Sequence, residues 1–196
     1  MEIYRLSCVI MLIIMLCSGL LLIFFPKLRH RENMYMQMLN NLNVGFFSGL
    51  MVSFSLTLIT YFYNEQQFLE NLFQQSRYIY VDSLSLEAEI MAGTPDYEAA
   101  MKNAFTIQAD VKKVNFLNYS PFFTDTEKAK QIKATQALYN RMEGYTAMIK
   151  TLQDSTDKDT LKKIREDIAA NTVQLYLFIM YLSKSNSKSY MTWKNV

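Results

Sequence analysis

The sequence is poor in the residues from which catalytic and metal sites are built. Its 196 residues include one histidine, His30, and two cysteines, Cys8 and Cys17. Both cysteines lie in one apolar segment near the N-terminus, so the rest of the chain offers neither a disulfide framework nor a thiolate zinc site. In such a segment cysteine is more often a small apolar residue than a reactive group. We therefore expect no metal site.

Glycine is also scarce, with five in the chain and only Gly93 and Gly144 beyond the apolar N-terminal region. The sequence contains no Walker-type loop, no G-x-G-x-x-G and no G-x-S-x-G elbow, so the usual phosphate cradles and nucleophile turn are missing. Carboxylates occur in neighbouring pairs such as Asp157 and Asp159, which are typical of a helix cap or a solvated helix face. We expect a protein that is not an enzyme and that needs no cofactor.

Charge of one sign is not in excess in the C-terminal two thirds of the chain. Beyond Tyr63 there are 16 basic and 16 acidic residues, whereas a nucleic-acid-binding domain usually carries a basic excess. We therefore expect no direct binding of nucleic acid. The basic cluster of Lys162, Lys163 and Arg165 could contact phosphate or lipid headgroups, but a solvated helix face explains it better.

Long hydrophobic runs are present. Leu6 to Phe25 and Val44 to Tyr63 are each 20 residues long without a charged residue. A helix of about 20 residues crosses a hydrocarbon core of about 30 Å, so we expect two transmembrane helices. A secretory signal peptide fits the first run less well. Its apolar region would measure about 7–15 residues and end at a small-residue cleavage site, whereas this run continues to Pro26.

The segment between the runs, residues 26–43, begins with three basic residues and then becomes amphipathic. A short interfacial helix and an ordered loop are both compatible with it. The basic residues that flank the membrane here are Lys27, Arg29 and Arg31. They outnumber the two on the outer flanks by one, which favours a connecting segment inside. A helical domain without cysteines suits the cytoplasm, however, and we expect it there, attached to the cell inner membrane by two spans.

The rest of the chain has helical periodicity without the two-residue alternation of strands. In "GTPDYEAA", Gly93 suits a helix C-cap, Thr94 an N-cap and Pro95 the first helical position. The second span can also continue as one rod from Val44 to Met91, on the order of 70 Å long. The expected soluble helices are 64–92, 95–118, 125–153 and 158–184, followed by a tail over 186–196.

The predicted fold class is therefore an all-α membrane protein. A transmembrane hairpin over residues 1–63 precedes a helical soluble domain over 64–185, which is long enough for one small bundle. The C-terminal stretch "VQLYLFIMYL", residues 173–182, is apolar nearly all round the helix. At ten residues it is too short to span, so it forms either the centre of the bundle or a surface that meets another subunit.

The second apolar run carries a small residue at every fourth position. These are Gly45, Gly49, Ser53 and Thr57, and residues four apart lie on nearly the same helix face. Helices in lipid associate through close backbone approach, which small residues permit. Two interpretations are open: the first span packs into this face, or second spans of different subunits pack together in a homo-oligomer.

Further hydroxyls lie on other sides of the same run, at Ser48, Ser55 and Thr60. Polar groups in a membrane need partners, either neighbouring helices or water. We therefore expect the second span to be the inner helix of an oligomer, as a closed helix cluster or around a narrow pore.

The order of parts resembles the two-span effectors of bacterial anti-phage defence systems, of the SLATT type or attached to retrons. The resemblance rests on "LSCVIMLIIMLCSGLLLIFF" and "VGFFSGLMVSFSLTLITYFY" followed by a long helix and a small helical domain. It implies a membrane-perturbing, pore-forming or depolarising effector that a regulatory protein or nucleoprotein partner holds silent. The alternative is a membrane-anchored adaptor or assembly subunit whose helical domain docks another protein.

Overall fold

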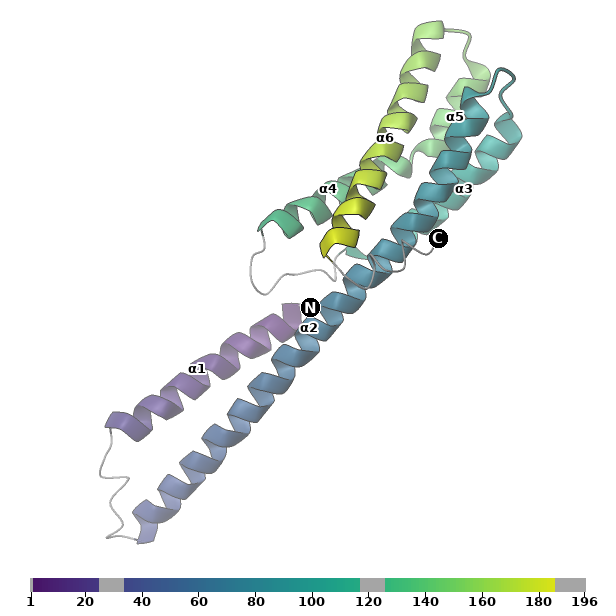
Figure 1. Ribbon diagram of the computed structural model, residues 1–196. Helices are drawn as coiled ribbons and strands as arrows, with labels where there is room; N and C mark the ends of the chain where they lie inside the picture. The colour runs from purple at the N-terminus through teal and green to yellow at the C-terminus, as the bar shows by residue number, and fades with distance from the viewer. Residues whose placement is uncertain (1, 25–33, 117–125, 186–196) are drawn as a thin grey trace. The chain divides into compact units, whose positions relative to one another are not determined.

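A computed structural model of the chain describes residues 2–24, 34–116 and 126–185. All regular structure in these ranges is helical, which confirms the expected all-α class there. Figure 1 shows the six helices. They are α1 (Glu2–Phe24), α2 (Met34–Met91), α3 (Tyr97–Lys113), α4 (Thr126–Met142), α5 (Tyr145–Asp154) and α6 (Lys158–Ser185).

The chain divides into two compact units. Unit 1 contains α1 and the part of α2 up to Gln66, and unit 2 contains α2 from Gln67 onward with α3 to α6. The helix α2 is uninterrupted and has 58 residues, so it measures about 87 Å. It contains no proline, and no glycine after Gly49, which removes the residues that usually break or kink a helix.

The start of α2 corrects both interpretations of the connecting segment for residues 34–43. The helix begins at Met34, ten residues before the second apolar run, so residues 34–43 are its first turns. They form neither a separate interfacial helix nor a loop. The preceding basic residues Lys27, Arg29 and Arg31 lie outside the described residues, as does the tail over 186–196.

The predicted helix over 95–118 is wrong at both ends. The side chain of Asp96, and not that of Thr94, caps α3, because its Oδ1 accepts hydrogen bonds from the N–H groups of Glu98 (3.1 Å) and Ala99 (3.0 Å). At the other end Val114 is extended and its N–H bonds to the carbonyl of Val111, which closes the helix after Lys113.

This difference in capping gives a direct test. Asp96→Ala should lower the free energy of unfolding of unit 2 by about 1 kcal/mol, the usual effect of losing an N-cap. Thr94→Ala, at the position that the sequence favoured, should have an effect several times smaller. Chemical denaturation of the detergent-solubilised chain, followed by near-ultraviolet circular dichroism of the buried tyrosines, measures both. A larger loss for Thr94→Ala than for Asp96→Ala would contradict this capping.

The single helix predicted over 125–153 is also wrong, because α4 ends at Met142 and α5 begins at Tyr145. Between them the N–H of Gly144 bonds to the carbonyl of Arg141 at 3.0 Å, which tightens the chain into a turn. Glycine disfavours a helix interior by about 1 kcal/mol relative to alanine, so the break falls where continuation is least favourable.

Unit 2 is held together by one apolar core to which α2 to α6 all contribute. Ala100 and Ala104 of α3 are fully buried, and such small side chains allow a close approach of α5, which α3 contacts extensively. From α5, Ile149 and Leu152 are buried in the same unit. The helix α2 contributes larger apolar side chains to this core. The fully buried apolar side chains that α2 contributes to unit 2 are Leu72, Phe73, Ile79, Leu86 and Ile90.

One polar pair crosses this core. The hydroxyl groups of Ser76 in α2 and Tyr139 in α4 are 2.7 Å apart and fully buried. The Ser76 hydroxyl also lies 2.7 Å from the carbonyl of Leu72, to which it donates. Burial raises the pKa of Tyr139 and keeps its phenol protonated at neutral pH. The pair fixes the level at which α4 meets α2.

Candidate functional site

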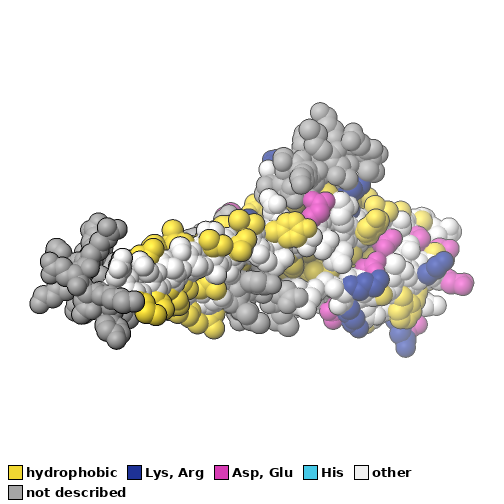
Figure 2. Space-filling view, turned by 90° about the horizontal axis from the view of Figure 1, so that it is seen from below, with side chains coloured by type: hydrophobic (Ala, Val, Ile, Leu, Met, Phe, Trp, Pro, Cys, Tyr) yellow, Lys and Arg dark blue, Asp and Glu magenta, His cyan; other side chains and the backbone are white. Residues whose placement is uncertain are grey.

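The most distinctive surface of the chain is the apolar exterior of unit 1. The described part of α2 contains an apolar stretch long enough to cross a membrane, and none of its most apolar 18 residues is buried within the chain. A second, shorter apolar helical stretch covers Leu6–Leu20 in α1. Figure 2 shows surface without charged side chains over part of the molecule, and clustered charges over another part. Length and composition alone establish only that such a helix could span.

Exposure of these side chains is the informative observation, since the core helix of a soluble protein would be buried. On α2 the exposed fractions reach 61% for Val52, 59% for Leu56 and 64% for Ile59. On α1, Leu6 is 63% and Leu16 is 57% exposed. Apolar patches of this extent on a protein surface mark contact with a membrane or with another protein.

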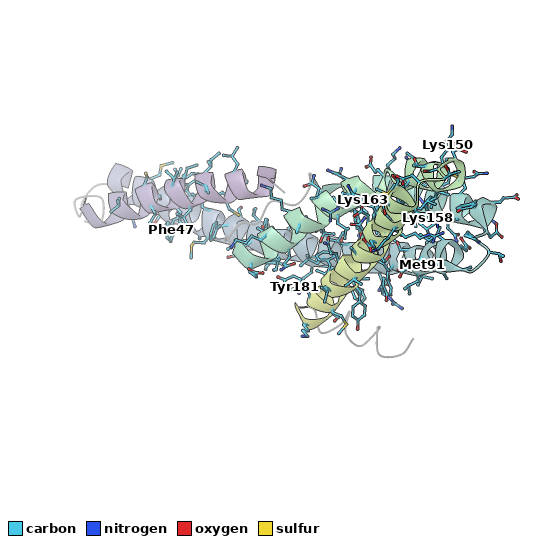
Figure 3. The ribbon with its side chains drawn as sticks, turned by 90° about the horizontal axis from the view of Figure 1, so that it is seen from above. Phe47, Met91, Lys150, Lys158, Lys163 and Tyr181 are labelled. Atoms are coloured by element: carbon cyan, nitrogen blue, oxygen red, sulfur yellow. The ribbon has the colours of Figure 1, made fainter. Side chains whose placement is uncertain are left out.

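Within unit 1, α1 contacts one side of α2. The hydroxyl of Ser18 donates to Oδ1 of Asn43 at 2.7 Å. A Cβ atom built at Gly19 would lie 3.8 Å from the ring of Phe47, an ordinary van der Waals distance. Phe47 is labelled in Figure 3. The Ser18–Asn43 pair was not anticipated from the sequence, although a polar residue directly before an apolar run was a signal for it.

The small residues lie mostly away from this contact. Gly45, Gly49 and Ser53 are exposed, and no described atom lies within 4 Å of a Cβ atom built at either glycine. Only Thr57 reaches α1, with its hydroxyl 3.9 Å from the sulfur of Met11. A four-residue repeat advances by about 40° per step, so the row turns around the helix toward α1. Among the described residues, α1 therefore does not contact Gly45 or Gly49, and of this row Thr57 meets it.

The hydroxyls of α2 are satisfied by the helix itself. Ser48 donates to the carbonyl of Gly45 (3.0 Å), Ser55 to that of Met51 (2.9 Å), and Thr60 to that of Leu56 (2.9 Å). Thr57 donates to Ser53 in the same way, at 2.8 Å. Such bonds to the preceding turn let hydroxyls lie in lipid without another partner. These hydroxyls therefore require neither a neighbouring helix nor water as a hydrogen-bond partner.

Two carboxylates of unit 2, those of Asp157 and Glu89, have structural roles. Asp157 caps α6 by accepting hydrogen bonds from the N–H groups of Asp159 and Thr160. A hydrogen bond from the Thr160 hydroxyl, together with these two backbone bonds, lowers the pKa of Asp157. Both carboxylate oxygens of Glu89 lie 3.0 Å from the side-chain nitrogen of Asn103. Among the described residues, no three histidine, cysteine or acidic side chains gather as metal ligands would.

Comparisons with protein families, with curated proteins and with solved structures found no match. The function must therefore be argued from the chain's own surfaces.

Proposed function

We propose that the chain is an integral membrane protein whose α1 and apolar α2 stretch span the bilayer as a hairpin. The observation that carries this proposal is the exposure of apolar side chains around both helices of unit 1. Moving one exposed leucine or isoleucine out of water gains roughly 1.5–3 kcal/mol, and many such side chains contribute here. In this proposal unit 2 is a helical bundle in the cytoplasm, attached to the inner membrane.

We propose further that the protein is a homo-oligomer whose second spans meet at the face of Gly45 and Gly49. Neither glycine faces any described atom of the chain, so the backbone there is open to another helix. Close helix approach at small residues is the usual basis of association in lipid. In the oligomer Ser53 and Thr57 lie at the edge of this contact. Ser48, Ser55 and Thr60 would then face neighbouring helices, lipid or a pore.

The activity that we propose for this oligomer is membrane perturbation, as in a bacterial defence effector. A regulatory protein or nucleoprotein would act on unit 2 and so control how the second spans assemble. The proposal rests on the oligomeric face and on the resemblance in the order of parts. Expression of the chain, alone and with the products of its neighbouring genes under phage infection, tests it with a membrane-potential dye. Loss of potential supports an effector, and unchanged potential in both settings contradicts it.

The second candidate is a membrane-anchored adaptor. The specific observation in its favour is that the α2 hydroxyls already bond within the helix, so nothing in unit 1 requires a water-filled pore. Replacement of residues 1–63 by an unrelated two-span anchor separates the two candidates. An adaptor should keep its function, whereas an effector should lose it. Immunoblotting of membrane fractions would control for expression of the chimaera.

A further inference from the structure

The last helix of unit 2, α6, carries apolar residues on two opposite faces. Val173 is 58% and Leu177 is 60% exposed. The buried apolar residues in the same part of the helix are Leu175, Phe178, Ile179 and Leu182. One face of the stretch over residues 173–182 therefore belongs to the core of unit 2, and the other face is open to a partner.

Two charged residues lie in line with the exposed face. Glu166 and Lys184 are 18 residues apart, which is five full helical turns, so they point in the same direction from α6. At about 100° per residue, Val173 and Leu177 point within about 20° of that direction, and the exposed Ala170 within about 40°. We name this surface the α6 strip, and it consists of Glu166, Ala170, Val173, Leu177 and Lys184.

The α6 strip is symmetric about the level of Leu175. Val173 and Leu177 lie two residues to either side of this level, and Glu166 and Lys184 lie nine residues to either side, or about 14 Å. A two-fold axis at this level pairs α6 with an antiparallel α6 of a second copy. Each exposed apolar residue then meets an apolar residue, and Glu166 of each copy meets Lys184 of the partner subunit.

The charges select the antiparallel orientation. In a parallel pair Glu166 would meet Glu166 of the partner subunit, and Lys184 would meet Lys184 of the partner subunit, so like charges would oppose association. Glu166 lies 3.8 Å from Lys162 of its own helix, but their side chains are 64% and 75% exposed, and such a pair contributes little by itself. The other exposed charges of this turn, Lys163 and Asp167, have opposite signs and lie to one side of the strip.

We propose that unit 2 binds a second copy of this chain through the α6 strip, as an antiparallel two-fold pair. The contact is isologous, since both copies use the same surface, and it therefore joins two copies. Leu177 also lines a groove of about 330 Å³ together with Ala134 of α4. This groove gives Val173 of the partner subunit room to pack beside Leu177.

The contact is small, with five residues from each copy. Stable complexes use roughly 20–30 residues a side, so we expect a dissociation constant on the order of 100 μM. The pair is therefore dissociated in dilute vesicles and forms where copies are concentrated. It is a different contact from the one proposed between second spans, and it does not rest on membrane insertion.

Charge reversal tests the contact in the full chain. The chain carries Gly49→Ile, so that second spans do not join copies, and its association in an uncharged detergent is measured by sedimentation equilibrium. Glu166→Lys and Lys184→Glu should each weaken the dimer roughly fivefold, because each places like charges at both ends of the pair. An equimolar mixture of the two variants should regain the original affinity, since opposite charges then meet at both ends.

Two further variants complete this experiment. Lys150→Glu makes the same change of charge at an exposed position of α5, which Figure 3 shows well away from Tyr181 of α6, and it should leave the dimer unchanged. Leu177→Ser removes the apolar centre of the strip and should abolish the dimer. Circular dichroism verifies that each variant keeps its helical content.

A chain that stays monomeric at millimolar concentration would overturn the proposal and leave the strip to a different protein. A dimer that is insensitive to Leu177→Ser and to both charge reversals would also overturn it, because the copies would then meet at another surface.

Crosslinking tests the orientation separately. Ala170 and Met180 lie five residues to either side of the level of Leu175, so in the antiparallel pair each meets the other residue of the partner subunit. In a background with serine at both cysteine positions, a mixture of Ala170→Cys and Met180→Cys chains should be linked by a short reagent. Either variant alone should not, because its two cysteines lie about 15 Å apart along the helices. Efficient linking of each variant to itself would show a parallel pair and contradict the proposal.

Discussion

Leu86→Ala should lower the free energy of unfolding of unit 2 by about 2–5 kcal/mol. Leu86 is fully buried in α2, and its truncation removes apolar contacts and leaves a cavity that neighbouring helices can fill only in part. This is a large share of the 5–15 kcal/mol that stabilises a typical domain. Chemical denaturation in detergent, followed by near-ultraviolet circular dichroism, measures the loss.

Leu84→Ala is the matched control, since it makes the same chemical change two residues away. Leu84 is 43% exposed, so its truncation should have a much smaller effect of roughly 1 kcal/mol or less. Equal effects of the two substitutions would contradict the register of α2 in the core of unit 2.

Gly49→Ile should abolish the proposed oligomer in membranes. A Cβ atom at this position meets no described atom of the same chain, so the isoleucine should leave the fold of the single chain unchanged. Between two second spans, however, it would hold the backbones apart and remove the close contact on which association in lipid depends. Crosslinking in vesicles and single-molecule photobleaching both report subunit number. We expect monomers where the original chain gives oligomers.

Met51→Ile introduces the same side chain on the opposite side of α2, where Met51 is 44% exposed. It should leave the subunit number unchanged, and Gly49→Ala should have an intermediate effect. Oligomers that persist with Gly49→Ile would show that the glycine face does not join subunits. A monomeric original chain would contradict the oligomer as a whole.

The class and long elements of this fold follow from the sequence because they depend on continuous patterns. The region from Val44 to Met91 contains no proline and only two glycines, Gly45 and Gly49 near its beginning, and a helix can therefore run through it. Helix ends were less predictable because several residues compete for each cap. Thr94 and Asp96 are both good N-caps, and only the backbone path shows which side chain meets the free N–H groups.

The neighbour that covers a given face of α2 was also not predictable from residue spacing. Spacing places Gly45, Gly49, Ser53 and Thr57 on nearly one face, but it does not say which neighbour covers that face. The structure gives α1 a different side of α2, where Asn43 and Phe47 lie. Likewise, the pattern around Leu177 does not reveal that α4 leaves a groove beside it, because that depends on the crossing of two helices far apart in the sequence.

The central claim is that the exposed apolar surface of unit 1 lies in a bilayer, and a spin-label comparison tests it most directly. Leu56 and Ile59 of α2 are 59% and 64% exposed, and Tyr78 and Val81 of the same helix are 66% and 59% exposed. In a background with serine at both cysteine positions, each is replaced by cysteine, labelled and reconstituted in vesicles. We predict that labels at the first pair collide mainly with oxygen, which concentrates in lipid, and labels at the second pair with a water-soluble nickel chelate. Nickel access at all four positions would contradict the claim.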